Sequence, residues 1–219
     1  MQAPQKVISN TMQMVLFVFI GSVFVVLLSF LNTPKWLLFI LILSASLLVF
    51  TVYPMFLIYR SNRLEAIDRY IIRNRKKPLF SYAYALAYEE DAQVVQALEG
   101  ILKKYKQPMM QTMYRANLYL HQKEVEQLRR HAETIENADL KAYYKGLADA
   151  LAGNLIEADE QLKVIQTPWM LHSLKATLAF ERQQFAVFEQ EVQRAVDAAR
   201  GLQKYGIYHS LKRTMRPDS

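Results

Sequence analysis

The fold is decided by the stretch from Met12 to Tyr59, which reads MQMVLFVFIGSVFVVLLSFLNTPKWLLFILILSASLLVFTVYPMFLIY. From Met12 to Leu31 and from Trp36 to Ile58 the chain carries no charged side chain, and Leu, Ile, Val and Phe dominate both runs. A hydrocarbon core of about 30 Å needs roughly 20 helical residues. The two runs contain 20 and 23 residues, so the stretch predicts two membrane-spanning helices.

The four residues between the runs, Asn-Thr-Pro-Lys at 32–35, predict a tight turn and therefore an antiparallel hairpin. Segment 60–77 contains seven basic and two acidic residues, whereas the turn contains only Lys35. Under the positive-inside rule this difference keeps segment 60–77 in the cytoplasm. The sequence thus predicts a multi-pass protein of a bacterial plasma membrane with both termini cytoplasmic.

Two other interpretations of the hairpin are weaker. A cleaved signal peptide needs a shorter apolar region and a small-residue cleavage site. Core helices of a soluble protein usually carry polar residues at helical spacing. Because neither run contains an ionisable group, we expect an anchor or a contact surface rather than a transport pathway. Pro54 predicts a kink near the inner end of the second run.

Segment 60–77 has the pattern of an amphipathic helix, with Leu64, Ile67 and Ile71 on one face. Its basic side chains are attracted to anionic lipid headgroups near a membrane surface. Retention of the segment inside the cell is the simpler alternative. The residues predicted to meet lipid headgroups are Arg60, Arg63, Arg69, Arg73, Arg75, Lys76 and Lys77.

Composition excludes several classes of function. The chain has no cysteine, which rules out disulfides, thiolate catalysis and cysteine-ligated zinc. Residues 78–219 contain 18 basic and 18 acidic side chains, so the net charge of +7 comes from the membrane flank and predicts no nucleic-acid partner.

An internal period of 30 residues begins after segment 60–77. Pro78, Pro108 and Pro168 are spaced by 30 and 60, which predicts an equivalent start at Ala138. Stacking the four units aligns Tyr84 with Tyr114, Tyr144 and Leu174; Val95 with Val125, Leu155 and Phe185; Leu98 with Leu128, Ala158 and Phe188; and Leu102 with Ala132, Leu162 and Val192. The last three columns have the spacing of one helical face. Breaks at Glu90-Asp91, His121-Gln122, Gly153-Asn154 and Arg182-Gln183 divide each unit into two helices.

The third unit, GLADALAGNLIEADEQL at 146–162, resembles a tetratricopeptide repeat through Gly146, Gly153, Leu155, Ala158 and Leu162. The other units match more loosely, with Ala116 and Ala176 at the small position and Leu98, Leu128 and Phe188 where the family prefers alanine. The 30-residue unit is also shorter than the usual length of about 34. The resemblance covers residues 78–200 and implies an all-α solenoid of about four units. Helical hairpins of this size bury their apolar faces by stacking on one another.

In that family the first helices line a concave groove that receives peptides or helices. Carried over by position, the groove residues are Met113, Asn117, Leu120, Tyr143, Leu147, Met170, Ser173 and Thr177. The neighbouring basic column of Arg115, Lys145 and Lys175 suits acidic groups of a partner, with a solvated helix face as the alternative. For the column of Tyr84, Tyr114 and Tyr144, core packing is favoured over binding.

The expected domain organisation has four parts. Residues 1–59 hold the spans (12–31 and 36–58), residues 60–77 form a basic linker, residues 78–200 the repeats, and residues 201–219 a capping helix and tail. In the capping helix we expect Lys204, Lys212 and Arg213 to point outward.

No catalytic constellation is recognisable. The four histidines, His121, His131, His172 and His209, lack metal-ligand spacing, and the six glycines form no phosphate-binding loop. We therefore expect no enzyme, cofactor or metal site. The sequence predicts a membrane-anchored adaptor whose partners are other proteins and anionic lipid. The alternative is an accessory subunit whose hairpin packs against a larger membrane enzyme or transporter.

Overall fold

The computed structural model describes residue 21 and residues 34–215, and all regular secondary structure within them is helical. The chain divides into two compact units, Met1–Arg60 and Ser61–Ser219. The first predicted span, residues 12–31, falls outside the described residues apart from Gly21.

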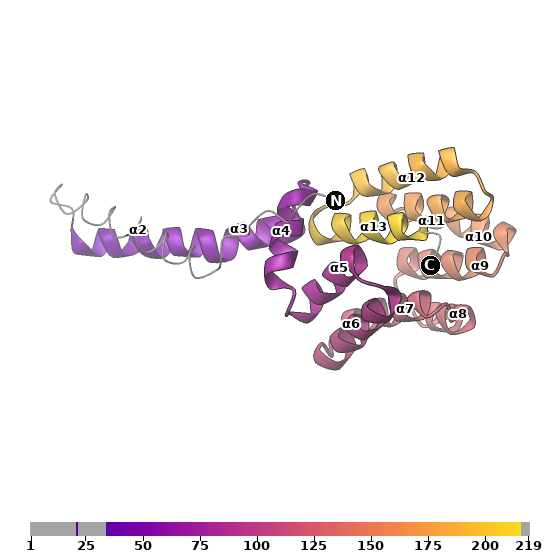
Figure 1. The fold of residues 1–219 in the computed structure, drawn as a ribbon, viewed down its shortest axis with the longest axis horizontal. Helices are drawn as coiled ribbons and strands as arrows, with labels where there is room; N and C mark the ends of the chain where they lie inside the picture. The colour runs from indigo at the N-terminus through magenta and orange to yellow at the C-terminus, as the bar shows by residue number, and fades with distance from the viewer. Residues whose placement is uncertain (1–20, 22–33, 216–219) are drawn as a thin grey trace. The chain divides into compact units, whose positions relative to one another are not determined.

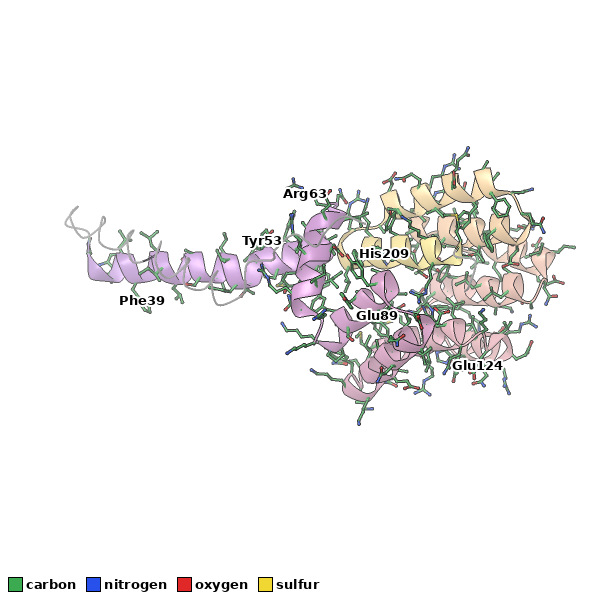
Figure 2. The ribbon with its side chains drawn as sticks, in the orientation of Figure 1. Phe39, Tyr53, Arg63, Glu89, Glu124 and His209 are labelled. Atoms are coloured by element: carbon green, nitrogen blue, oxygen red, sulfur yellow. The ribbon has the colours of Figure 1, made fainter. Side chains whose placement is uncertain are left out.

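In the first unit, three helical segments follow one another without a break: α2 (Lys35–Leu47), η1 (Leu48–Val52) and α3 (Tyr53–Tyr59). Within them, Phe39–Tyr59 is long and apolar enough to cross a membrane, with 21 residues and a mean hydropathy of 2.2. Only 6% of its most apolar part is buried, and side chains such as Phe39 and Tyr53 project from the ribbon in Figure 2. By length and composition, the described part of the chain contains one candidate span.

Pro54 has a visible effect on this helix. Segment η1 is a π-helix that ends two residues before Pro54. Proline has no amide hydrogen and its ring clashes with the carbonyl four residues back, which here belongs to Phe50. A wider turn relieves the clash, and the helix forms a π-helical segment just before Pro54. The kink expected from the sequence stays a prediction.

The second unit consists of helices joined by short connections (Figure 1). Its first helix is α4 (Leu64–Asn74), and four pairs and a final helix follow: α5 (Pro78–Tyr88) and α6 (Asp91–Lys104), α7 (Pro108–His121) and α8 (Val125–Glu133), α9 (Ala138–Leu151) and α10 (Leu155–Leu162), α11 (Pro168–Glu181) and α12 (Phe185–Ala198), then α13 (Gly201–Thr214). The predicted helix starts at 78, 108, 138 and 168 are confirmed. Each helix from α4 to α13 packs against the next one in the chain.

The starts of the four pairs have local causes. Proline is the first residue of α5, α7 and α11, where its missing amide hydrogen costs nothing. Helix α9 starts with Ala138 instead, and there the side chain of Asn137 accepts a hydrogen bond from the amide of Leu140 at 2.9 Å. A polar cap thus takes the place of proline in the third pair.

The turn inside a pair repeats in the last three pairs. Lys123, Gly153 and Gln183 are spaced by 30 residues and have φ angles of 58°, 81° and 59°. At these turns, amide hydrogen bonds run from Glu124 to the carbonyl of Tyr119, from Asn154 to that of Asp149, and from Gln184 to that of Ala179. This six-to-one bond is that of a Schellman motif, which satisfies carbonyls at a helix C-terminus.

The first pair ends its first helix differently. Helix α5 has 11 residues where α7, α9 and α11 have 14. Its C-terminal carbonyls are reached by Arg213, whose guanidinium donates hydrogen bonds to Leu86 at 3.1 Å and to Glu89 at 2.7 Å. The same guanidinium pairs with Asp91, at the start of α6, at 2.6 Å.

Helix α13 corrects the expectation of a simple cap on the last pair. It contacts α11 and α12, but also α4 and α5 at the beginning of the unit, as Figure 1 shows. Lys204 and Arg213 are buried, so the expectation that they point outward is wrong, whereas Lys212 is exposed as expected. Arg213 is buried because α5 offers it acceptors, and Lys204 pairs with Asp197 at 3.5 Å.

The core contains the predicted column of the second helices. Leu98, Leu128, Ala158 and Phe188 are at most 1% exposed. Gly146 is also buried, because a Cβ atom there would collide with the side chain of Leu174 on α11. The small residue therefore allows α9 and α11 to approach closely.

The repeated turn leads to a stability prediction. Gln183→Gly should raise the free energy of unfolding by about 1 kcal/mol, because a residue with a side chain is strained at positive φ. Gly153→Ala should lower it by a similar amount. Urea unfolding of the full chain in mild detergent measures both, with Trp169 fluorescence as the signal in a Trp36→Phe background.

The control for this pair is Gln122→Gly, since Gln122 has a φ of −80°. Glycine relieves no strain at this position, so the free energy of unfolding should not increase. Equal effects of Gln122→Gly and Gln183→Gly would contradict the assignment of strain to the left-handed residue.

Arg213 leads to a second prediction. Arg213→Met keeps an apolar stem but leaves the carbonyls of α5 without their donor. Charged hydrogen bonds of this kind contribute about 2–3 kcal/mol each when a buried partner is left behind, so we expect a loss on that order. Lys212→Met, on the exposed face of the same helix, should change stability by less than about 0.5 kcal/mol. Equal losses in the same urea assay would show that the guanidinium contacts contribute nothing.

Candidate functional site

The place where a groove was predicted contains the protein's own aromatic side chains. Helices α5, α7 and α9 contribute Tyr82, Tyr114, Tyr143 and Tyr144, which together with His121 we call the tyrosine cluster. The ring of Tyr82 lies 5.8 Å from that of Tyr114 and 6.4 Å from that of His121. The rings of Tyr143 and Tyr144 are 5.2 Å apart. The two contacts of Tyr82 are edge-on, whereas Tyr143 and Tyr144 are tilted, and aromatic contacts of both kinds stabilise a core.

The environment keeps these phenols neutral. Burial raises the pKa of Tyr114 and of Tyr143 to about 12, and it raises that of Tyr144 well above its usual value. The hydroxyl of Tyr144 donates a hydrogen bond to the side chain of Asn117 at 3.1 Å. The favoured interpretation of the tyrosine column as core thus fits Tyr144, whereas Tyr84 remains half-exposed.

The predicted groove residues do not form one open surface. Leu147 is 4% exposed and Ser173 is 2% exposed, so neither can touch a partner. Their positions face other helices because α9 and α11 pack closely at Gly146. The remaining predicted residues are half-buried: Met113, Asn117, Leu120, Tyr143, Met170 and Thr177. Four of these pack against the core, namely Met113, Leu120, Tyr143 and Met170.

The predicted basic column is also partly used inside the domain. Lys145 forms an ion pair with Glu133 at 2.8 Å, and Lys141 pairs with the same carboxylate at 2.9 Å. Their hydrogen bonds lower the pKa of Glu133 to about 2. Arg115 is exposed and bonds to Gln111 on its own helix, and Lys175 is half-buried.

The predicted lipid-facing helix is shorter than segment 60–77, and its apolar face is occupied. Ile67 and Ile71 are 2% and 0% exposed, and α4 packs against α5 and α13. The apolar face therefore stabilises the domain and is not free to enter lipid. The basic side chains Arg60, Arg63, Arg69, Arg75, Lys76 and Lys77 are exposed, and that of Arg73 is half-buried.

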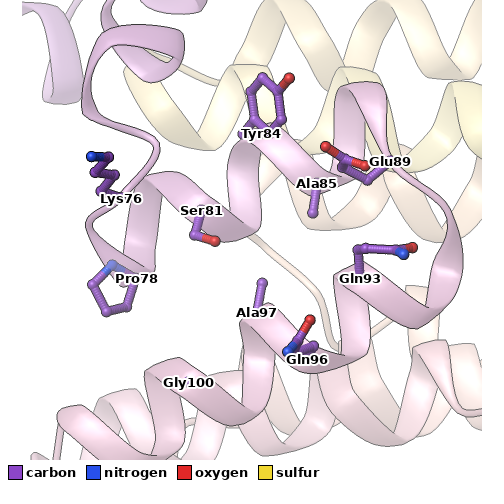
Figure 3. A pocket seen from close by; sticks show the side chains of 10 residues that line it. All are labelled: Lys76, Pro78, Ser81, Tyr84, Ala85, Glu89, Gln93, Gln96, Ala97 and Gly100. Atoms are coloured by element: carbon purple, nitrogen blue, oxygen red, sulfur yellow. The ribbon is translucent and has the colours of Figure 1, made fainter.

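A hollow of about 330 Å³ lies between α5 and α6, and we call it the polar hollow. Figure 3 shows Lys76 and Pro78 at one end and Glu89 at the other. The remaining lining residues are Ser81, Tyr84, Ala85, Gln93, Gln96, Ala97 and Gly100. Hydroxyl and amide side chains can bond with the backbone of an extended peptide, and Lys76 suits a carboxylate.

The polar hollow exists because the first pair departs from the other three. Helix α6 begins at Asp91, four residues earlier than the 30-residue period requires, and it carries Gly100 in its interior. Nothing lies within 4 Å of a Cβ atom placed on Gly100. The hollow was not predicted from the sequence, although the early break at Glu90-Asp91 and the glycine inside a helix were available as signals.

Two charged clusters elsewhere are structural. Asp149, on α9, pairs with Arg129 of α8 at 2.9 Å, and burial raises its pKa. Glu191, on α12, is contacted by His172 at 2.6 Å and by Arg194 at 2.6 Å. Each cluster joins neighbouring helices. Among the described residues, no group of three or more His, Cys, Asp or Glu side chains is placed to hold a metal ion.

Comparison with known proteins gives no relatives: the chain matches no family model, no curated protein and no solved structure at a significant level. The structure itself defines the class only as an all-helical protein, with one apolar helix in the first unit and a helical domain as the second unit.

The tyrosine cluster predicts a pH effect through His121. Burial lowers the pKa of this imidazole from 6.5 to about 4. The charge of Arg213 lowers this pKa further, whereas that of Asp91 raises it. The unfolded chain therefore binds a proton at higher pH than the folded chain does. Stability should be full above pH 6.5 and fall as the pH decreases toward 4, by about 3 kcal/mol in total from this residue.

His121→Gln removes the titrating group. In this variant, the difference in unfolding free energy between pH 7 and pH 5 should be smaller than in the unaltered protein. The same difference in both proteins would mean that the pKa of His121 does not change on folding.

Proposed function

We propose that the protein is a membrane-anchored adaptor whose helical domain binds a peptide segment of another protein in the polar hollow. The polar hollow is the observation that carries the proposal. It is open, and most of its lining side chains offer hydrogen-bond donors or acceptors. Its length runs along α5 from Lys76 to Glu89, which suits an extended segment better than a compact small molecule.

The chemistry of its ends gives the partner a direction. Lys76 is exposed and attracts an acidic side chain or a terminal carboxylate, whereas Glu89 at the other end suits a basic group. The ring of Tyr84 offers an apolar surface between them. We infer a partner segment with opposite charges at its two ends. The proposal gives the protein no reaction of its own.

The apolar segment Phe39–Tyr59 supports membrane anchoring by its length, hydropathy and exposure. We propose that residues 12–31 form a second span, so that both termini are cytoplasmic and the helical domain lies at the inner face of a bacterial plasma membrane. The excess of basic residues in segment 60–77 is the argument for this orientation. We also propose that the repeated pairs stack as a tetratricopeptide-like solenoid, on the basis of the 30-residue period in helix starts and turns.

One observation favours the alternative of an accessory subunit. In segment η1 the backbone follows a π-helical instead of an α-helical pattern, which widens the helix locally. A neighbouring span of a larger membrane protein can approach the helix at such a point. Replacing residues 12–58 by an unrelated hairpin separates the two ideas, because an adaptor keeps its partner after this exchange and an accessory subunit loses it.

Photo-crosslinking in native membranes tests the adaptor proposal directly. A photoreactive amino acid at Gln96, which lines the polar hollow, should form an adduct with a discrete partner. Gly100→Trp should abolish the adduct, because the indole fills the space above α6. Gly206→Trp is the matched control, since a Cβ atom at Gly206 on α13 also meets nothing within 4 Å. An adduct that survives Gly100→Trp would place the partner outside the hollow.

A further inference from the structure

Two connections bring separate basic segments together at one end of the first helix pair. Arg75, Lys76 and Lys77 lie between α4 and α5, while Lys103 and Lys104 end α6 and Lys106 follows it. The two segments are neighbours because α5 and α6 run in opposite directions. The polar hollow shows this, with Lys76 and Pro78 across from Ala97 and Gly100 (Figure 3). We call these six side chains the basic patch.

On α6, the residues that line the hollow lead to the basic patch. Gln93, Gln96 and Gly100 are separated by three and four residues, and Lys103 and Lys104 continue that spacing by three and four more. Residues at this spacing share one face of a helix. Lys103 and Lys104 therefore extend the lining of the hollow toward the end where Lys76 lies.

The charge of the basic patch is not neutralised within the domain. All six side chains are exposed, and among the described residues none of them is in an ion pair. Arg75 lies over the ring of Tyr84 at 5.4 Å, and Lys106 donates to the carbonyl of Leu102 at 3.0 Å, but neither partner is anionic. Lys141, Lys145 and Lys163, in contrast, are paired with glutamates.

Chain geometry limits the distance between the basic patch and the end of the apolar helix. The domain begins at Ser61, directly after the helix that ends at Tyr59, and the carbonyl of Ser61 accepts a hydrogen bond from Gly201 at 2.8 Å. Only Asn62, Arg63 and the 11 residues of α4 separate Ser61 from the α4–α5 connection. A helix of that length spans about 16 Å. The covalent tether alone therefore keeps the patch near any bilayer that the apolar helix enters.

We propose that the basic patch is a second membrane contact, which binds the phosphate groups of anionic phospholipids in the bilayer that holds the apolar helix. The inference rests on the membrane anchoring in the proposed function. It differs from the sequence prediction because half of the patch comes from α6 and the connection after it, whereas the apolar face of α4 plays no part. Each basic residue near an anionic surface strengthens binding by about fivefold at low ionic strength.

The contact would set the orientation of the polar hollow. Its Lys76 end would lie at the lipid surface, and its Glu89 end, about one helix length away, would point into the cytoplasm. A partner peptide would then enter from the Glu89 end.

The experiment uses the full chain reconstituted in vesicles of neutral phosphatidylcholine, with or without phosphatidylglycerol. Because the chain has no cysteine, a single fluorophore can be attached at Gln107→Cys, beside the patch, or at Ala152→Cys, in the α9–α10 turn. Energy transfer to an acceptor on lipid headgroups should rise at residue 107 when anionic lipid is present. It should fall again in 0.5 M salt, and it should not rise at residue 152.

The test variant is Lys103→Glu/Lys104→Glu/Lys106→Glu, which should abolish the rise at residue 107. The control variant, Arg115→Glu/Arg130→Glu/Lys212→Glu, makes the same change in net charge at exposed positions outside the patch. The rise in energy transfer at residue 107 should persist in this variant. Lipid binding by the basic patch would be contradicted by equal energy transfer in the two lipid mixtures. It would also be contradicted if both variants lost the rise at residue 107. A different result would show that the patch binds protein instead of lipid: the unaltered chain retains an acidic protein, the test variant does not, and energy transfer at residue 107 is the same in both.

Flotation with neutral vesicles tests membrane anchoring separately from lipid binding by the basic patch. A chain that floats without a lipid-dependent rise at residue 107 is anchored but has no lipid-binding patch. A chain that does not float with neutral vesicles refutes the anchoring, and the inference falls with it.

Discussion

The second unit depends on one buried cation. The guanidinium of Arg213 lies at the C-terminal end of α5, where the last carbonyls of any helix lack partners within the helix. It donates to these carbonyls and pairs with Asp91, so a single side chain of the last helix joins both helices of the first pair. A charge that has lost its water must find acceptors of this quality. On the same helix, the hydroxyl of Tyr205 donates to Asp68 of α4 at 2.6 Å, which fixes the last helix to the first.

The helical pairs could be predicted from the sequence because their signals are local. Proline at the start of a helix, glycine or a polar residue at a turn and an apolar column at helical spacing each act within a few residues. The return of α13 has no such signal. Lys204 and Arg213 have the pattern of solvated residues, and the acceptors of Arg213 include backbone carbonyls, which any sequence supplies.

The candidate site shows the same division between local and tertiary causes. The predicted groove was carried over by position, but Leu147 and Ser173 turn inward where α9 and α11 approach each other. The polar hollow arises because α5 is short and α6 starts early, and these are departures from the repeat. A repeat period predicts the features that all units share, but it does not predict how one unit differs from the others. The basic patch was half visible in segment 60–77, and only the antiparallel packing of α5 and α6 adds Lys103, Lys104 and Lys106.

The bond between Tyr205 and Asp68 joins residues that are 137 positions apart. An open array of repeats gains its stability by adding one unit to the next, and it can begin to fold at either end. Here α4, the first helix of the second unit, packs against both α5 and α13, so part of its packing is missing until α13 has been synthesised. A chain that ends before α13 would therefore lose packing at the beginning of the domain as well as at its end, and would leave α4 partly uncovered and open to chaperones and proteases.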